Sequence, residues 1–174
     1  GTTKPGIIVA AYPGSDTNVR GTQQLFLGRH NIINADVISM GGHKSTGQIL
    51  FRTGLTGGYA ILRGSAGEAD KVKRMTIGDP RARIVDMTGG GTSAASTGTF
   101  NTTGNYLDLS TTDLMVARTQ LTGTGNSTGT LTFDQGIIDA DNLYIGYHSP
   151  GLTTAANATG TLNLNGTGVV TVNN

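Results

Sequence analysis

Short segments in which apolar and polar residues alternate recur along the chain, and each ends in a small residue. The segment 33–41 (INADVISMG) returns as 138–146 (IDADNLYIG). In the second copy, Leu143 and Ile145 are apolar at alternate positions, which is the period of a strand with one buried face. We call the four recurrences anchor segments; they cover residues 37–41, 74–78, 113–117 and 142–146. They predict four strands in equivalent places of a repeat.

Two further strands are expected between successive anchors. The second strand is predicted at 49–51, 85–87, 131–133 and 162–164, and the third at 32–33, 107–109 and 137–138, with 25–27 as a partial first coil. The anchor residues Met40, Ile77, Val116 and Ile145 are separated by 37, 39 and 29 residues, inside the window of repeat architectures. The length variation is confined to loops, as a stack of coils requires. The pattern predicts an all-β protein, a parallel β-solenoid (β-helix) with about three short strands per coil.

Small residues mark the expected corners of the coils. The anchors end in Gly41, Gly78, Ala117 and Gly146, where the chain should bend and glycine reaches positive φ without steric cost. Thr-Gly pairs at 46–47, 128–129 and 159–160 are expected to form turns before the second strand. The content of glycine, threonine and asparagine disfavours helices.

The first 22 residues differ in texture from the rest. An apolar run, Ile7 to Ala11, is followed by Tyr12 and bracketed by Pro-Gly pairs, which signal turns. We expect a strand here that lies outside the repeat register, either as a cap on the first coil or as an arm that pairs with a neighbour. The predicted division is an N-terminal arm over 1–22 and a solenoid over 23–174.

Composition narrows the classes of function. Charged residues make up 13% of the chain, about half the usual quarter, so threonine, serine, asparagine and glycine must cover the surface. A net charge of +1 without a run of like charges gives no footprint for nucleic acid or anionic lipid. No stretch approaches the roughly 18 apolar residues of a membrane-spanning helix. The absence of cysteine excludes disulfides and thiolate metal sites.

Candidate metal and catalytic groups are sparse. His43 and His148 occupy the same place in the repeat but are several coils apart, so we expect solvent-facing loop roles. Asp134, Asp139 and Asp141 suit calcium as residue types, but the calcium-binding nonapeptide of solenoids is missing and we expect turn-forming roles. The acidic residues are dispersed rather than clustered in a groove. The sequence therefore predicts no enzyme activity, no cofactor and no metal.

The segments DADNLYIGYHS and ATGTLNLNGTGVVTVNN resemble the autotransporter-associated β-strand repeats of large bacterial surface proteins, including those with PEP-CTERM-type sorting tails. The resemblance covers 105–174 and 24–54, and is weaker over 55–104. It implies a right-handed solenoid displayed outside the cell, as a stalk, passenger or matrix component, and it implies no catalytic residues.

The final segment, GVVTVNN, is a strong strand sequence without a charged or proline-rich cap. An uncapped solenoid end presents unpaired backbone groups that a copy of the chain can cover. Head-to-tail contacts that do not close build filaments. We therefore expect a self-assembling extracellular or cell-surface fibre or sheath subunit, with copies of itself as partners. The expected assembly residues are Ile7, Ile8, Val9, Tyr12, Val169, Val170 and Val172.

Two other functions are compatible with the sequence. A carbohydrate-binding or adhesive surface module would contact cell-surface or matrix polysaccharide through Tyr106, Tyr144 and Tyr147, because sugars stack on aromatic faces. Alternatively, the chain is an internal fragment of a giant surface stalk protein, without a separate activity.

Overall fold

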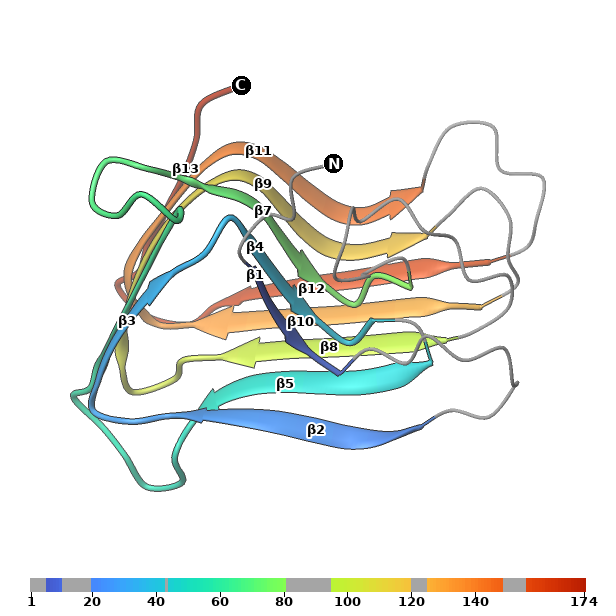
Figure 1. Ribbon diagram of the computed structural model, residues 1–174, viewed down its shortest axis with the longest axis horizontal. Helices are drawn as coiled ribbons and strands as arrows, with labels where there is room; N and C mark the ends of the chain where they lie inside the picture. The colour runs from blue at the N-terminus through green and yellow to red at the C-terminus, as the bar shows by residue number, and fades with distance from the viewer. Residues whose placement is uncertain (1–5, 11–19, 43, 81–94, 120–124, 149–155) are drawn as a thin grey trace.

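The computed structural model describes residues 6–10, 20–42, 44–80, 95–119, 125–148 and 156–174 (Figure 1). In these ranges the chain forms thirteen β-strands and no helix. The strands are β1 (Gly6–Val9), β2 (Arg20–Leu27), β3 (His30–Asn34), β4 (Val37–Met40), β5 (Ser45–Phe51), β6 (Tyr59–Arg63), β7 (Val72–Ile77), β8 (Ser96–Asn101), β9 (Tyr106–Thr119), β10 (Ser127–Phe133), β11 (Gln135–His148), β12 (Ala158–Leu164) and β13 (Val169–Val172).

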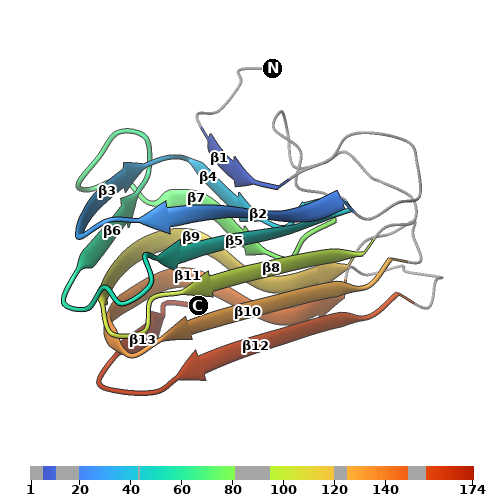
Figure 2. The ribbon, with the colours of Figure 1, turned by 90° about the horizontal axis from the view of Figure 1, so that it is seen from below.

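The strands form two parallel sheets, between which the chain alternates. Sheet A contains β1, β3, β4, β6, β7, β9, β11 and β13, and sheet B contains β2, β5, β8, β10 and β12. Every pairing between these strands is parallel and joins one pass of the chain to the next. In Figure 2, sheet B runs as a ladder from β2 to β12, with sheet A behind it. This all-β arrangement is consistent with a β-solenoid.

The anchor segments occupy equivalent places, as predicted. Met40 pairs with Ile77, Ile77 with Val116, and Val116 with Ile145. The residue after each is at positive φ, with 68° for Gly41, 74° for Gly78, 60° for Ala117 and 65° for Gly146. The predicted corners are therefore confirmed.

The predicted third strand and the anchor belong to one bent sheet rather than to two separate faces. They are distinct strands in β3 and β4 and again in β6 and β7. In β9 and β11 they fuse into continuous strands of 14 residues each, which curve visibly in Figure 1. The coil thus has two sheets where three separate strands were expected.

The N-terminal strand β1 lies inside the repeat register. Ile7 pairs with Ile38 and Val9 with Met40, and Ala10 has a φ of 65° like the other corner residues. The prediction that the run from Ile7 to Ala11 is off-register is wrong for Ile7 to Ala10, and Ala11 lies outside the described residues. The β-branched residues of the run have the same alternation as the anchors, and the Pro-Gly pairs beside it obscured that match.

Two strands of the central coils were not predicted. One is β8, the sheet B strand between β5 and β10, with which it pairs. The segment predicted for that place, 85–87, lies outside the described residues. The strand β6 pairs with β3 and β9.

The Thr-Gly pairs lie within strands of sheet B rather than in turns. Gly47, Gly98, Gly129 and Gly160 form one column across β5, β8, β10 and β12. A Cβ atom on Gly98 would lie 2.6 Å from the Met40 carbonyl oxygen and 2.7 Å from the Ile77 carbonyl carbon. The glycine column exists because the corner of sheet A packs backbone to backbone against sheet B.

Three inward columns of apolar side chains run along the stack and build the core. These columns are Ile7, Ile38, Met75, Leu114 and Leu143; Leu25, Ile49, Phe100, Leu131 and Leu162; and Ile33, Leu62, Leu109, Ile138 and Val170.

Candidate functional site

The two ends of the stack present open strand edges. At one end, β1 pairs only with β4, β2 only with β5, and β3 only with β6 among the described strands. At the other end, β12 pairs only with β10 and β13 only with β11 in the same part of the chain. Because β13 covers only residues 137–140 of β11, the half of β11 from Asn142 to His148 is also an open edge there. We call these the N-terminal and C-terminal edges.

Burial along the inward columns falls sharply at both edges. The three interior residues of every column are at most 1% exposed, as in Ile38, Met75 and Leu114. The first and last residues of every column, such as Ile7 and Leu143, pack against the core but are only partly buried. The apolar cross-section of the stack is therefore open at both ends within the described residues.

Several side chains at the edges are substantially exposed despite being large and apolar. At the C-terminal edge, Ile145 is 47% exposed, Leu164 48% and Val169 53%. Strand edges that must stay unpaired usually carry lysine, other charges or proline. Among β1, β2, β3, β12, β13 and residues 142–148, Arg20 in β2 is the only charged residue, and none is proline.

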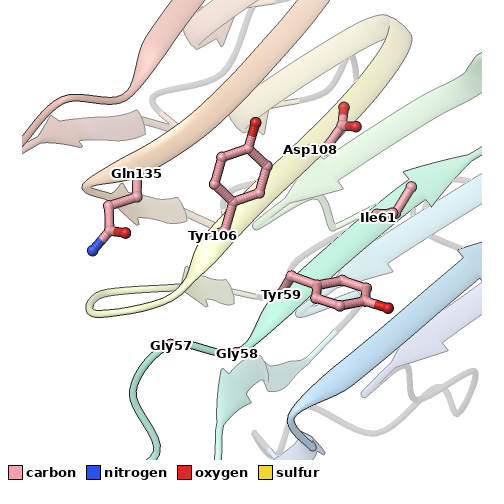
Figure 3. A pocket seen from close by; sticks show the side chains of 7 residues that line it. All are labelled: Gly57, Gly58, Tyr59, Ile61, Tyr106, Asp108 and Gln135. Carbon is pink, nitrogen blue, oxygen red and sulfur yellow. The ribbon is translucent and has the colours of Figure 1, made fainter.

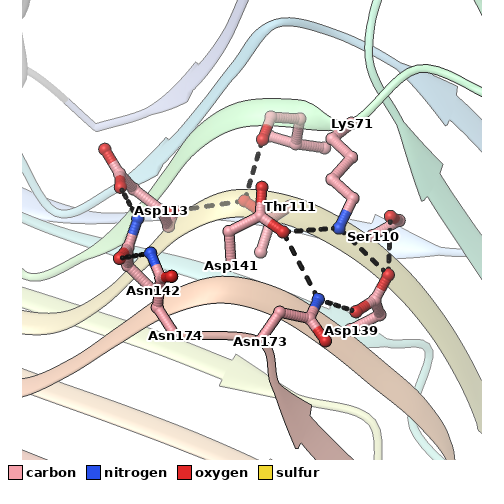
Figure 4. Close-up of polar contacts among 10 residues, drawn as sticks. Lys71, Ser110, Thr111, Asp113, Asp139, Asp141, Asn142, Asn173 and Asn174 are labelled. Atoms are coloured by element: carbon pink, nitrogen blue, oxygen red, sulfur yellow. Dashed lines mark hydrogen bonds and ion pairs between the residues drawn. The ribbon is translucent and has the colours of Figure 1, made fainter.

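A polar ladder on sheet A ties successive coils together (Figure 4). The Lys71 ammonium donates to Asp141 Oδ1 at 2.7 Å and to Asp139 Oδ2 at 3.2 Å. The Asn173 amide donates to Asp139 Oδ1 at 2.8 Å and to Asp141 Oδ1 at 3.3 Å. Lys71 precedes β7 and Asn173 follows β13, so the ladder links the middle of the stack to its C-terminal edge.

The ladder shifts the titration of its members. Hydrogen bonding to Asp141, and then to Asp139, raises the pKa of Lys71. The Asn173 amide and then Lys71 lower the pKa of Asp139, while Lys71 and then Asn173 lower that of Asp141. Asp139 and Asp141 are strand residues of β11, not the turn formers predicted from sequence.

A second ladder runs parallel to the first. Arg74 Nη2 lies 3.2 Å from Asp113 Oδ2, Asn142 Nδ2 donates to Asp113 Oδ1 at 3.1 Å, and Asn174 Nδ2 donates to Asn142 Oδ1 at 3.1 Å. These residues stack along one column, as cross-strand pairs do. Both ladders are structural and end at the C-terminal edge.

The outer face of sheet A carries an aromatic hollow of about 440 Å³ (Figure 3). Its lining residues are Gly57, Gly58, Tyr59, Ile61, Tyr106, Asp108 and Gln135. Tyr59 and Tyr106 are paired neighbours on β6 and β9. Tyr59 also stacks on His30 of β3, with ring centroids 4.8 Å apart, and Asp108 is held by Arg63 at 2.7 Å.

The structure separates the three tyrosines predicted as a sugar-binding set. Tyr144 and Tyr147 touch edge to face, with centroids 5.0 Å apart. Tyr106 is paired with Gln135, which precedes Tyr144 on β11 by about 30 Å of extended strand. The tyrosine that does lie beside Tyr106 is Tyr59, which the sequence reasoning missed although Tyr59 and Tyr106 both open an alternating apolar run.

The predicted assembly residues that the structure describes lie at the two edges. Ile7, Ile8 and Val9 are in β1 and are partly buried, and Val169, Val170 and Val172 are in β13 at the opposite end. Tyr12 lies outside the described residues. The two groups are thus on opposite ends of the stack.

Metal and membrane candidates find no support in the described part of the chain. Within those residues no group of three or more metal-ligating side chains occurs, and no helix there is long and apolar enough to cross a membrane. His148 Nε2 lies 3.0 Å from the Ala156 carbonyl oxygen, and His43 lies outside the described residues.

Comparison with known proteins gives no assignment. No protein-family model matches the chain, and neither a curated protein nor a solved structure matches it.

Proposed function

We propose that this chain is a structural subunit that stacks head to tail into a β-solenoid filament or sheath at the outside of a cell. The solenoid is right-handed, as the repeat resemblance implies. Copies of the chain are its partners, and no catalytic step is involved. The observation that carries the proposal is the contrast between fully buried interior columns and open apolar ends.

The two edges suit each other as stacking surfaces. All pairings within each sheet are parallel, so a second copy placed on the C-terminal edge in the same orientation continues both sheets. Burying exposed apolar side chains is favourable by about 25 cal/mol per Å², and each new coil also pairs open backbone groups. A contact between different ends does not close, so it propagates.

The test is electron microscopy of the purified 174-residue chain at neutral pH over a range of concentrations. Filaments whose strands lie perpendicular to the long axis support the proposal, and they should give a meridional reflection near the strand spacing of about 4.8 Å. Single particles of one chain at about 1 mM would refute the proposal, because exposed apolar surface already drives association at μM to mM concentrations.

The intact mass of the native protein separates this proposal from the stalk alternative. A native mass near 17.8 kDa fits a polymerising subunit. A far larger mass, together with single particles from the 174-residue chain, would make the described coils one part of a continuous stalk.

The aromatic hollow supports adhesion to polysaccharide as a second candidate. Tyr106 is 43% exposed and lies with Tyr59 beside the polar groups of Asp108 and Gln135, a mixture of aromatic and polar groups that suits a sugar ring. Glycan binding that Tyr106→Ala abolishes and Tyr147→Ala preserves would support this function. Loss of binding in the Tyr147 variant alone would contradict it.

A further inference from the structure

The two ends of the stack differ by half a coil of sheet A. At the N-terminal edge, β1 adds one strand beyond β4, on the anchor side of the sheet only, because β3 has no described neighbour beyond it. At the C-terminal edge, β13 adds one strand beyond residues 137–140 of β11. The anchor half of β11, from Asn142 onward, has no such strand in the described part of the chain. One end thus projects the half-coil that the other end lacks.

The projecting strand and the open place share one register. Ile7, Ile38, Met75, Leu114 and Leu143 lie in a single column, and Val9 belongs to the column that ends at Ile145. The two other inward columns match in the same way. Leu25 and Leu162 are the first and last members of one column, and Ile33 and Val170 are those of the other.

From this match we infer that β1 of one copy fills the open half-coil of the preceding copy, beside residues 143–145 of its β11. The inference rests on the proposed head-to-tail stacking and specifies its interface. Ile7 lies beside Leu143, Ile8 beside Tyr144 and Val9 beside Ile145. In the same contact β2 pairs with β12 of the preceding copy and β3 with its β13, so every open edge gains a neighbour.

Backbone hydrogen bonds at the corner repeat from coil to coil and extend across the interface. The Gly41 N–H donates to the Val9 carbonyl at 3.0 Å, and the Gly78 N–H to the Met40 carbonyl at 2.8 Å. The next equivalent bond joins the Ala10 N–H of one copy to the Ile145 carbonyl of the preceding copy. Ala10 already has the left-handed corner conformation that this bond requires, with a φ of 65°.

Side-chain chemistry also fits at the interface. The strands β1, β12 and β13 and residues 142–148 carry no charged residue, so like charges do not meet there. Ile145, which is 47% exposed, becomes an interior residue of its column once Val9 covers it. Asn174 hydrogen-bonds Asn142, so the place left open for β1 of the next copy begins at Leu143.

The interlock fixes the axial repeat of the filament. Each copy contributes the five strands of sheet B, so one copy advances the stack by about 24 Å at a strand spacing of about 4.8 Å. If β1 instead sat as an extra layer between copies, the repeat would be about 29 Å.

Cysteine cross-linking tests the register, because the chain has no cysteine of its own. In the variant Ile8→Cys/Tyr144→Cys, the two sulfurs of one chain are about 19 Å apart, four strand spacings along the stack, which exceeds the reach of a disulfide. Across the interface the same positions are direct neighbours. Mild oxidation of filaments should therefore give a ladder of covalent dimers, trimers and longer oligomers on a non-reducing gel. The matched control, Ile8→Cys/Tyr147→Cys, is three residues out of register and should give at least tenfold less.

The outcomes distinguish the interface from the function. Cross-linked oligomers in the first variant only, with a repeat of about 24 Å in unmodified filaments, support both the interlock and the proposed filament function. Three results would overturn the interlock but not head-to-tail stacking. They are filaments without cross-linked oligomers, equal cross-linking in both variants, and an axial repeat of about 29 Å. Absence of filaments from the unmodified chain overturns the proposed function. The repeat is measured on the unmodified protein, so poor folding of a variant cannot decide the result.

Discussion

At the scale of single residues, the glycine of the Thr-Gly pairs sets how closely the two sheets approach. Gly98→Ala should lower the free energy of unfolding by about 1–3 kcal/mol, the usual cost of overpacking a core, because the new methyl meets the backbone of Met40 and Ile77. Gly28→Ala is the control, since no atom lies within 4 Å of its added Cβ. Urea unfolding of both variants provides the comparison. Equal midpoints would show that the sheets can separate without cost.

Which glycines could be predicted from the sequence follows from the kind of constraint each one meets. Gly41 and Gly78 close alternating strands, and a corner with positive φ is a local requirement that a repeat displays. Gly98 and Gly129 meet a constraint from another sheet, and the pattern of their own strand does not contain it. The pair that contains Gly129 was assigned to a turn, and no prediction was made for Gly98.

At the same scale, the ladder around Lys71 should make stability depend on pH. The lowered pKa values of Asp139 and Asp141 stabilise the fold above their ordinary value of 3.8, and this contribution is lost as the pH falls through the folded pKa values. The raised pKa of Lys71 stabilises the fold below 10.5, and that part is lost as the pH rises through its folded pKa. The contribution is therefore largest between the two limits.

Lys71→Met should accordingly lower the melting temperature by a few degrees at pH 7, and the difference from the unmodified chain should shrink below pH 4. Lys73→Met is the matched control, because Lys73 pairs with Asp70, only three residues before it, and is more exposed than Lys71. Calorimetry across pH 3–8 measures both. A difference that stays constant over this range would mean that the ladder does not couple to folding.

At the scale of the strand, the open edge of β13 can be blocked without disturbing its existing pairing. The Asn173 N–H donates to the Ala140 carbonyl on β11, and N–H groups alternate sides along a strand, so the Val172 N–H points away from β11. Val172→Pro removes that donor. It should slow filament growth at least tenfold while leaving the melting temperature of unassembled chains nearly unchanged. Val172→Ala, which keeps the N–H, is the control, and equal growth rates would contradict the edge pairing.

The anchor strands were predictable from the sequence because each carries an alternating apolar pair before a small residue, whereas β6 was missed although Ala60 and Leu62 alternate in it. The anchor register from Met40 to Ile145 was predicted residue for residue, since each anchor has two apolar residues followed by a small one. The strand β8 has a single large apolar residue, Phe100, and its place was assigned to 85–87. The two sheets of the coil were also not predicted, because the joining of the third strand and the anchor in one sheet shows in the pairing of β9 with β11 and not in the pattern of either segment alone.

For the whole molecule, the open ends should be its least protected parts until copies assemble. In unassembled chains, amide hydrogen exchange should be fast in β1, β2 and β13 and slow in β8 and β9, because local opening is easiest where few buried contacts hold a strand. Assembly places the end strands in the interior, so their exchange should slow by tenfold or more while that of β8 stays the same. Mass spectrometry of peptides from both states measures this. End-to-end stacking is the arrangement that buries β1 and β13 together. If amide exchange slowed only in the loops or on the outer face of sheet A, the chains would be associating side by side and the stacking model would be wrong.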